Sequence, residues 1–317
     1  MRMRQLGHTD LRVAPLCLGG NTIGWTTDEA ASFAVLDAYV EAGGNFIDTA
    51  DAYSRWAPGN VGGESETILG NWMASRGNRS AIVMATKLGA DIGKGDRRLS
   101  RTYITSAVED SLRRLRTDYI DLYQAHYDDL DTPQEETHAA FDALVRQGKV
   151  RALGVSNFEA DRIASARAIT EQNGYAHYEV YQPSYSLMDR QRYESEFEPF
   201  ILEHGMSVIP YWPLAAGFLT GKYRDGQPLP NSARADGVKS KYMNERGFAV
   251  LGELDRIAAA HGATVAEVAL AWVLARPSIT APIASATSPA QVAELMKAID
   301  VQLDPADIAA LDAVSAP

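Results

Sequence analysis

Four polar residues lie at or just after the C-terminal ends of short apolar segments. Asp48 ends the segment NFID, Tyr53 follows five residues later, Lys87 ends AIVMATK, and His126 ends YIDLYQAH. Core packing gives no reason for buried strands to end repeatedly in titratable side chains. In a parallel β-barrel the C-terminal ends of all strands lie on one face, and active sites form on that face. We therefore predict that these four side chains meet in one pocket.

Together, the four side chains suit the protonation of a carbonyl oxygen. A free tyrosine has a pKa of about 10, and a nearby ammonium group lowers that pKa because it favours the phenolate. An aspartate beside the lysine would keep the ammonium group charged and in place. A histidine can orient a bound carbonyl or relay a proton. The hydride that reduces the carbonyl carbon has to come from a cofactor, because no side chain supplies one.

The elements that must position these residues are short apolar strands that alternate with helical patterns. Asp28 and Ser100 are predicted to cap helices at their N-termini, Thr132 and Pro133 to start one, and Gly43 to stop one. The opening residues, MRMRQLG and DLRVAPLCLGG, predict a short β-hairpin. The predicted strands are 16–19, 45–50, 81–88, 119–126, 150–158, 178–186, 206–214 and 280–287, with helical patterns between them and two more after the last strand.

This alternation predicts an α/β fold with a parallel sheet. Eight units in 317 residues favour a (β/α)8 TIM barrel, formed as one domain over residues 1–317, with an N-terminal β-hairpin. The alternative, a doubly wound open sheet, would need a glycine fingerprint after the first strand, but LGGNTIG does not match G-x-G-x-x-G. The polar segment 221–246 would be a long loop after strand seven, and therefore a candidate lid or ligand-binding segment.

Composition restricts the partners and the compartment. The net charge of −11 disfavours nucleic acid or an anionic membrane as a partner, since both attract basic surfaces. Cys17 is the only cysteine, so no intramolecular disulfide can form, which fits a reducing cytoplasm. We expect no signal peptide, no membrane span, no metal site and a monomer that acts on a small molecule. The remaining histidines within or near helices and strands are expected to be structural or solvent-facing: His138, His177, His204 and His261.

Six motifs occur in order along the chain: GGNFIDTADAY, GGESETILG, ATK, QAH, GVSNF and PLAAGFLTGKY. This series resembles the aldo-keto reductases, and the resemblance extends from the opening hairpin to about Leu295. It implies a (β/α)8 barrel that binds NADP(H) without a Rossmann domain. It also implies that Tyr53 is the general acid in reduction and the base in oxidation. Lys87, paired with Asp48, would tune Tyr53, and His126 would position the substrate carbonyl.

The resemblance also implies a cofactor site. Ser156, Asn157 and Gln182 would hold the nicotinamide carboxamide, and Tyr211 would stack on the nicotinamide ring. The pyrophosphate would lie along the segment from Pro213 to Gly217, where small residues let the backbone approach it. The implied cofactor-binding residues are Gly20, Asn21, Asp48, Ser156, Asn157, Gln182, Tyr211, Trp212, Pro213, Leu214, Ala216, Gly217, Lys222, Arg234, Ser285, Thr287, Gln291 and Glu294.

At the 2′-phosphate end, the chain departs from part of the family. Many members carry Lys and Arg after strand eight, whereas this chain has small polar residues and Gln291 there, with Glu294 kept for the adenine. The branch that includes potassium-channel β subunits instead uses a Lys and an Arg from the loop after strand seven. Lys222 and Arg234 are placed to act in this way, so we favour NADP(H) over NAD(H). A frequent family Asn is Leu295 here, which weakens the adenine assignment.

Several aromatic residues follow the predicted strands and could line a substrate pocket. Trp25, Trp56 and Tyr127 are the main candidates, together with Tyr185 and Trp212; packing among loop neighbours is the alternative interpretation. An aromatic wall would favour bulky, apolar carbonyl substrates over small sugars.

Two other functions are compatible with parts of the pattern. One is a redox-sensing or regulatory subunit that binds the cofactor and turns over slowly, as in the channel β-subunit branch. That branch has Asn where this chain has His126, so His126 favours catalysis. The other is a barrel aldolase in which Lys87 forms a Schiff base, although the nicotinamide-type motifs argue against it.

Overall fold

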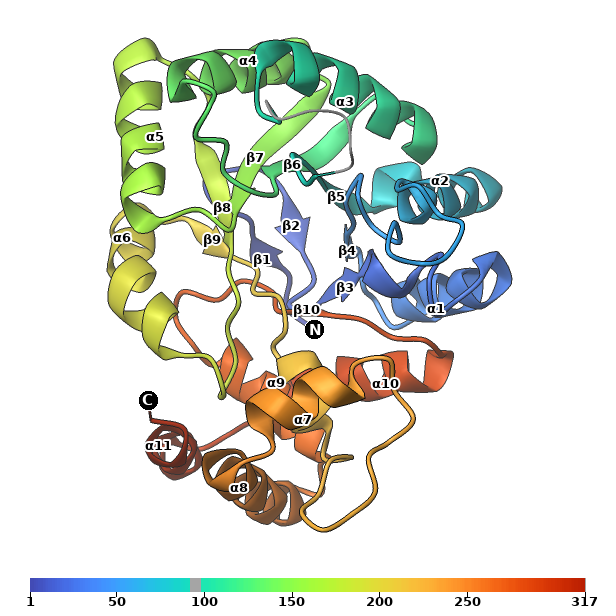
Figure 1. Cartoon of the computed structure of the whole chain (residues 1–317), viewed down its shortest axis with the longest axis vertical. Coiled ribbons are helices and arrows are strands. Elements are labelled where there is room, and N and C mark those ends of the chain that lie inside the picture. Colours follow the sequence, from blue (N-terminus) through green and yellow to red (C-terminus); the bar gives the residue numbers. More distant parts are fainter. Residues whose placement is uncertain (92–97, 317) are drawn as a thin grey trace.

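The computed structural model describes residues 1–91 and 98–316, which form a ring of eight parallel strands surrounded by helices (Figure 1). The strand order around the sheet is β10-β3-β4-β5-β6-β7-β8-β9. The backbone N–H groups of Thr280 and Ile283 close the ring by donating to the carbonyls of Val208 and Pro210, at 2.8 and 2.9 Å. The predicted (β/α)8 barrel is confirmed. Its strands are β3 (Cys17–Gly19), β4 (Phe46–Asp48), β5 (Val83–Leu88), β6 (Ile120–Ala125), β7 (Val150–Ser156), β8 (Tyr178–Gln182), β9 (Ser207–Val208) and β10 (Ile283–Ala284).

The predicted N-terminal hairpin pairs β1 (Arg4–Gln5) with β2 (Arg12–Val13) in antiparallel fashion. Its side chains Leu6, Leu11 and Val13 are buried in one cluster with residues that point into the barrel, such as Phe46 and Leu122. The hairpin therefore closes the N-terminal end of the barrel with apolar surface and leaves the C-terminal end for polar residues.

Strand alternation explains how polar groups reach the barrel interior. Every second residue of a strand points to the same side. The interior positions are apolar at the start of each strand and polar at its end: Phe46 precedes Asp48, Ala85 precedes Lys87, and Leu122 precedes Gln124. The core and the polar site thus share the same strands, one above the other.

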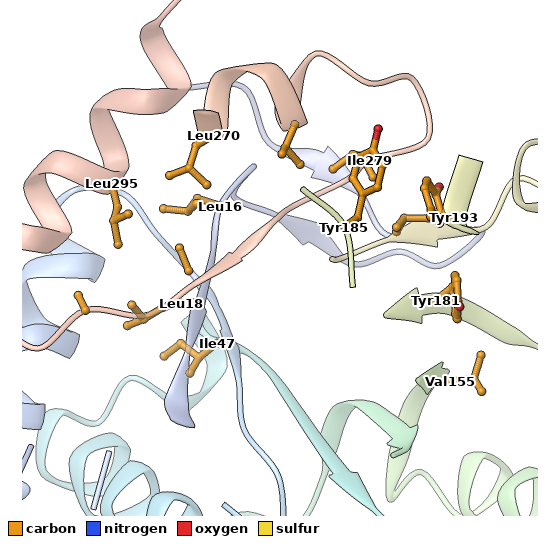
Figure 2. Packing of buried hydrophobic residues seen from close by; sticks show 14 of the residues in the cluster. Leu16, Leu18, Ile47, Val155, Tyr181, Tyr185, Tyr193, Leu270, Ile279 and Leu295 are labelled. Carbon is orange, nitrogen blue, oxygen red and sulfur yellow. The ribbon is translucent and has the colours of Figure 1, made fainter. Parts of the chain in front are cut away.

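Helices cover the outside of the barrel, and a large apolar cluster fills the space between the two layers. Figure 2 shows Leu18, Ile47 and Val155, from three strands, in this cluster with Leu270 and Leu295 from helices. The helices are α1 (Glu29–Glu41), α2 (Glu64–Arg76), α3 (Arg101–Leu115), α4 (Gln134–Arg146), α5 (Ala160–Asn173), α6 (Glu198–Glu203), α7 (Ala235–Tyr242), α8 (Glu245–His261), α9 (Val265–Leu274), α10 (Pro289–Lys297) and α11 (Pro305–Val314).

Two of the predicted caps are present as hydrogen bonds. The Asp28 side chain accepts from the backbone N–H of Ala31 at 2.8 Å, and the Ser100 hydroxyl accepts from that of Tyr103 at 3.3 Å. Pro133 lies at the N-cap of α4, so the helix begins at Gln134, one position later than the sequence suggests. These local signals therefore set the helix starts to within about one residue.

The long segment after strand seven contains a short helix that the sequence pattern does not reveal. A 3-10 turn covers Ala215–Thr220, and α7 follows within the segment predicted as a loop. Only Val238 and Tyr242 of α7 are buried, which is too short a stripe to show as helical periodicity. Among the described residues, no single helix is long and apolar enough to cross a membrane. Helices α8 and α9 have the necessary length and hydropathy only when taken together, and the chain bends by 95° between them.

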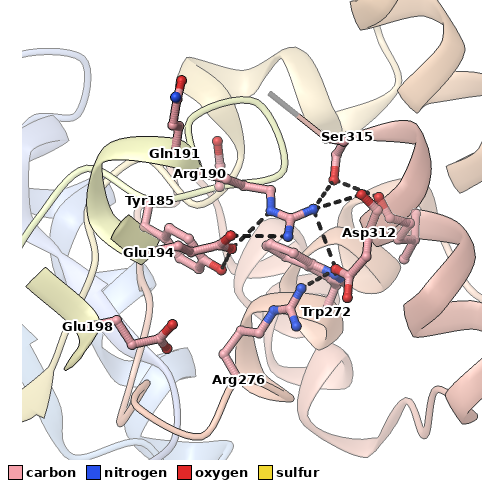
Figure 3. A network of polar contacts seen from close by, with 12 residues as sticks. Tyr185, Arg190, Gln191, Glu194, Glu198, Trp272, Arg276, Asp312 and Ser315 are labelled. Atoms are coloured by element: carbon pink, nitrogen blue, oxygen red, sulfur yellow. Dashed lines mark hydrogen bonds and ion pairs between the residues drawn. The ribbon is translucent and has the colours of Figure 1, made fainter. Parts of the chain in front are cut away.

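A polar network fixes the C-terminal helix to the loop after β8 (Figure 3). Arg190 donates to the Asp312 carbonyl at 2.9 Å and to the Ser315 hydroxyl at 2.8 Å. Tyr185 lies within this region, 1% exposed and stacked on Trp272 at a ring distance of 5.6 Å. The prediction that Tyr185 could line the substrate pocket is therefore wrong, because the loop turns its side chain into the core.

Candidate active site

Asp48 and Lys87 form a buried ion pair at the C-terminal ends of β4 and β5. Lys87 Nζ donates to Asp48 Oδ2 at 2.6 Å, to the Thr49 carbonyl at 2.7 Å and to the Tyr53 hydroxyl at 3.0 Å. These three contacts use all three ammonium protons. The Lys87 and Asp48 side chains are 0% and 1% exposed, so solvent does not compete for them.

The second oxygen of Asp48 is held by two amides, one from β6 and one from β8. Gln124 Nε2 and Gln182 Nε2 donate to Asp48 Oδ1 at 3.1 and 3.0 Å. The family resemblance assigns Gln182 to the cofactor and gives Gln124 no role. The position of Gln124 could have been predicted from strand alternation, which places Leu122, Gln124 and His126 on the same side of β6. Asp48 is therefore fixed from both sides and keeps Lys87 in one position.

Tyr53 lies beside the ion pair, half-buried at the mouth of the barrel. Burial raises its pKa to about 12, although the Lys87 charge pulls in the opposite direction. The expected downward effect of the lysine is thus present, but the expected net lowering of the tyrosine pKa is wrong, because loss of water outweighs it. At neutral pH Tyr53 holds its proton and is ready to act as an acid.

His126 is the fourth member of this group, with its ring centroid 6.0 Å from that of Tyr53. Burial, with the Lys87 charge as a second cause, lowers the pKa of His126 well below its usual value. The imidazole is therefore neutral and can donate one N–H to a bound oxygen. Its buried Nδ1 atom has no hydrogen-bond partner among the residues that the structure describes.

The state of Lys87 argues against Schiff-base chemistry. Burial alone would lower the pKa of Lys87, but Asp48 and Tyr53 together outweigh burial and raise it. A lysine nucleophile needs a neutral amine, whereas Lys87 is held as an ammonium with every proton engaged. The arrangement suits an electrostatic role toward Tyr53 and not the attack of an aldolase.

Four of the residues predicted to bind nicotinamide form one hydrogen-bonded group beside His126. Asn157 Nδ2 donates to the His126 carbonyl at 2.9 Å, and the Tyr211 hydroxyl donates to Asn157 Oδ1 at 3.0 Å. The Ser156 hydroxyl donates to the Gln182 carbonyl at 2.8 Å. Asn157 has φ of 54°, in the left-handed region. The structure thus brings Ser156, Asn157, Gln182 and Tyr211 together next to the catalytic candidates.

The segment after β9 carries a run of left-handed backbone conformations. Trp212, Ala215 and Ala216 have φ values of 57°, 48° and 56°, and Gly217 has φ of 97°. Non-glycine residues seldom adopt such angles, and clusters of them mark ligand-binding segments. Pro213 is buried and Leu214 half-buried in this segment. It is the segment that the resemblance assigns to the pyrophosphate.

Lys222 and Arg234 extend this segment with two positive charges. Neither side chain has an ion pair or hydrogen bond within the described ranges 1–91 and 98–316. Burial and the nearby Arg234 charge lower the pKa of Lys222, and burial lowers that of Arg234. The Arg234 guanidinium lies 5.9 Å from the Trp25 ring centroid. Two like charges held close together without an acidic partner are suited to bind an anion.

The remaining predicted cofactor residues lie around the ends of β3 and β10. Ser285 donates to Asn21 Oδ1 at 2.6 Å, next to Gly20. Thr287 donates to the Gln291 side chain at 3.1 Å. Glu294 is half-buried on α10, and the following Leu295 lies in the apolar core, 7% exposed.

The three substrate-pocket candidates lie in ring contact with the group around Tyr53. Trp56 is 6.0 Å from Tyr53 and 5.6 Å from Trp25, while Tyr127 stacks on His126 at 4.9 Å. In the part of the chain that the structure describes, no cluster of three or more His, Cys, Asp or Glu side chains could hold a metal ion.

Comparison with known proteins identifies a family and relatives that include oxidoreductases. The model of the Aldo/keto reductase family matches residues 15–316. The chain is 37% identical to the uncharacterized oxidoreductase YrpG of Bacillus subtilis (strain 168), over 96% of this chain and 93% of that protein. It is 34% identical to a probable voltage-gated potassium channel subunit beta of Oryza sativa subsp. japonica, over 95% and 92%. It is 32% identical to the aldo-keto reductase YhdN of Bacillus subtilis (strain 168), over 93% and 88%.

Proposed function

The chain belongs to the aldo/keto reductase family and is an oxidoreductase, and we propose that it uses NADPH to reduce aldehydes or ketones to alcohols. The observation that carries this proposal is the Tyr53–Lys87–Asp48 contact set beside a neutral His126. A protonated tyrosine next to a fixed ammonium group is suited to give a proton to a carbonyl oxygen.

The residues around the site fit a dinucleotide phosphate. Lys222 and Arg234 supply the cations for its 2′-phosphate, and the left-handed segment up to Gly217 supplies close backbone approach for the pyrophosphate. Tyr211 and Asn157 would hold the nicotinamide end. When bound, NADP(H) supplies or accepts a hydride.

Tyr53 supplies the proton in the direction of reduction. Its hydroxyl hydrogen goes to the carbonyl oxygen, which leaves a phenolate 3.0 Å from Lys87 Nζ. The ammonium group stabilises that phenolate, and Asp48 holds the ammonium group in position. His126, neutral and on the other side of Tyr53, donates an N–H to the same oxygen and fixes its direction.

The test is the replacement Tyr53→Phe, which removes only the phenolic oxygen. We expect NADPH-dependent reduction of 4-nitrobenzaldehyde to fall by about 100-fold or more, the usual contribution of a positioned general acid. Tyr119→Phe is the matched control, because Tyr119 precedes β6 at the opposite end of the barrel. Full activity in Tyr53→Phe would exclude the proposed acid.

A second candidate function is a regulatory subunit that binds the cofactor and turns over slowly. The similarity to a probable voltage-gated potassium channel subunit beta supports it. His126, in contact with Tyr53, supports catalysis instead. Tight NADPH binding with negligible turnover across a panel of aldehydes and ketones would favour the regulatory function.

We also propose that the protein acts in the cytoplasm as a monomer. Its single cysteine, Cys17, is buried and free, which is compatible with a reducing compartment. Light scattering after gel filtration should give a mass near the chain mass of 34.4 kDa. A mass near twice that value would contradict the monomer.

A further inference from the structure

Five aromatic rings lie in one continuous series across the mouth of the barrel, with Tyr53 at its centre. We call this series, formed by Trp25, Trp56, Tyr53, His126 and Tyr127, the aromatic row. Its successive ring centroids are 5.6, 6.0, 6.0 and 4.9 Å apart. A carbonyl oxygen at the Tyr53 hydroxyl therefore has aromatic surface on both sides.

Two rings of the aromatic row present much of their surface to solvent. Trp56 is 51% exposed and Tyr127 is 45% exposed. Seven large apolar side chains are exposed among the described residues, and five of them lie in loops after β4, β6 and β9: Trp56, Val61, Tyr127, Leu130 and Trp212. Trp56 and Tyr127 contact Tyr53 and His126, and exposed apolar surface beside such groups is suited to bind an apolar ligand.

Trp56 is held in place although it is exposed. Its ring meets that of Trp25 at 88° and that of Tyr53 at 61°, both edge-to-face arrangements that aromatic pairs prefer. Arg234 covers the other end of the series, over Trp25. Because the ring is supported on both sides, a ligand does not have to order it on binding.

The charges of the surrounding loops restrict the ligand further. The three loops that carry the exposed aromatic residues, 49–63, 126–133 and 209–214, contain one Lys or Arg, which is Arg55. Arg55 donates to the Asp91 carbonyl. Asp128, beside Tyr127, carries a negative charge and pairs with Arg162 at 2.7 Å. With this one cation against Asp51, Asp128, Asp129 and Asp131, the three loops carry a net negative charge that disfavours an anionic substrate.

We propose that the preferred substrate is a neutral, planar aryl aldehyde or ketone with at least two fused rings, and that Trp56 determines this preference. The inference rests on the proposed reductase function and names its substrate class. A single ring at Tyr53 has little surface left to reach Trp56, whereas a fused ring extends onto it. Tyr127 supplies the corresponding surface on the side of His126.

Kinetics of matched aldehydes test the proposal. In the wild type, we expect kcat/KM for 2-naphthaldehyde to exceed that for benzaldehyde by about tenfold, the scale of one aromatic contact. In Trp56→Ala this ratio should fall to about twofold. Leu202→Ala is the matched control, since Leu202 is equally exposed at 51% but lies on α6. An unchanged ratio in Trp56→Ala, or a wild-type preference for benzaldehyde or 4-carboxybenzaldehyde, would overturn the proposal.

A binding measurement separates this inference from the reductase function itself. Calorimetry with 2-naphthylmethanol should detect binding to the wild type that weakens about tenfold in Trp56→Ala and stays unchanged in Leu202→Ala. That result would support the aromatic surface even if no aldehyde were reduced, in which case only the proposed function would fail. Equal binding to wild type and Trp56→Ala, or no binding to either, would overturn the inference.

Discussion

At the scale of single residues, the site is governed by the balance between burial and the charge of Lys87. Burial raises the pKa of Tyr53 to about 12, and Lys87 acts against that rise. The two directions of the reaction need opposite protonation states of the same hydroxyl: reduction needs the phenol, and oxidation needs the phenolate.

The rate of alcohol oxidation should therefore increase with pH while the rate of aldehyde reduction does not fall. Since a raised pKa leaves little phenolate at neutral pH, log kcat/KM for oxidation should rise by about one per pH unit between pH 7 and 10. Reduction should stay level over that range. Both profiles can be measured by NADPH absorbance, and a reduction rate that falls tenfold by pH 9 would contradict the raised pKa.

Single residues also show what the sequence could and could not predict. Motifs located Asp48, Lys87 and Tyr53, which lie together as one contact set. Gln124 was overlooked because a glutamine in a buried strand carries no motif of its own, although alternation places it beside Asp48. The direction of the Tyr53 pKa shift was predicted wrongly. The shift depends on how deeply the side chain is buried, and sequence patterns do not reveal the loop conformations that bury it.

At the scale of elements, we propose that the segment between β9 and α7 carries the specificity for the 2′-phosphate of the cofactor. Its two cations, Lys222 and Arg234, have lowered pKa values, and burial is the main cause for each. The double replacement Lys222→Gln and Arg234→Gln should raise the KM for NADPH by about 10–100-fold, since a charge-assisted hydrogen bond contributes about 1.5–3 kcal/mol. The KM for NADH, which lacks that phosphate, should change little.

The same segment provides the control for this prediction. Arg224 is already paired with Asp255 at 2.5 Å. Arg224→Gln removes one positive charge from the same loop, half the charge that the double replacement removes, and should leave the ratio of the two KM values unchanged. If Arg224→Gln and the double replacement weakened NADPH binding equally, general attraction by the loop would explain the preference, and specific phosphate contacts would not.

Helices and strands could be predicted where a sequence pattern repeats along the chain, and less well where no pattern repeats. Alternation with helices located all eight barrel strands, and short polar side chains located the starts of α1 and α3. The helix α7 was not predicted, because its buried face consists of Val238 and Tyr242 alone. Tyr193–Phe197 adopts a π-helix inside a segment that reads simply as helical, since both helix types bury similar faces.

At the scale of the whole molecule, the barrel is closed by contacts between segments far apart in sequence. Backbone hydrogen bonds join 208–210 to 280–283, and Arg190 ties the loop after β8 to the last helix. Such long-range contacts follow from the strand count but not from any local motif. Because these contacts connect distant segments into one closed barrel, we expect a buried titratable group outside the site to affect the stability of the fold.

His138 is such a group, and it should make the protein sensitive to acid. It lies on α4, 1% exposed, with its ring 4.9 Å from Tyr178, and burial lowers its pKa to about 4. An unfolded chain takes up this proton near the ordinary pKa of about 6.5, so the unfolded state gains protons first as the pH falls. The resulting loss in the free energy of unfolding is absent above pH 6.5 and grows to about 3 kcal/mol as the pH falls to 4.

The free energy of unfolding of His138→Phe, measured by urea denaturation, should therefore fall less steeply than that of the wild type between pH 6.5 and 4. Parallel curves would show that His138 does not carry this acid sensitivity.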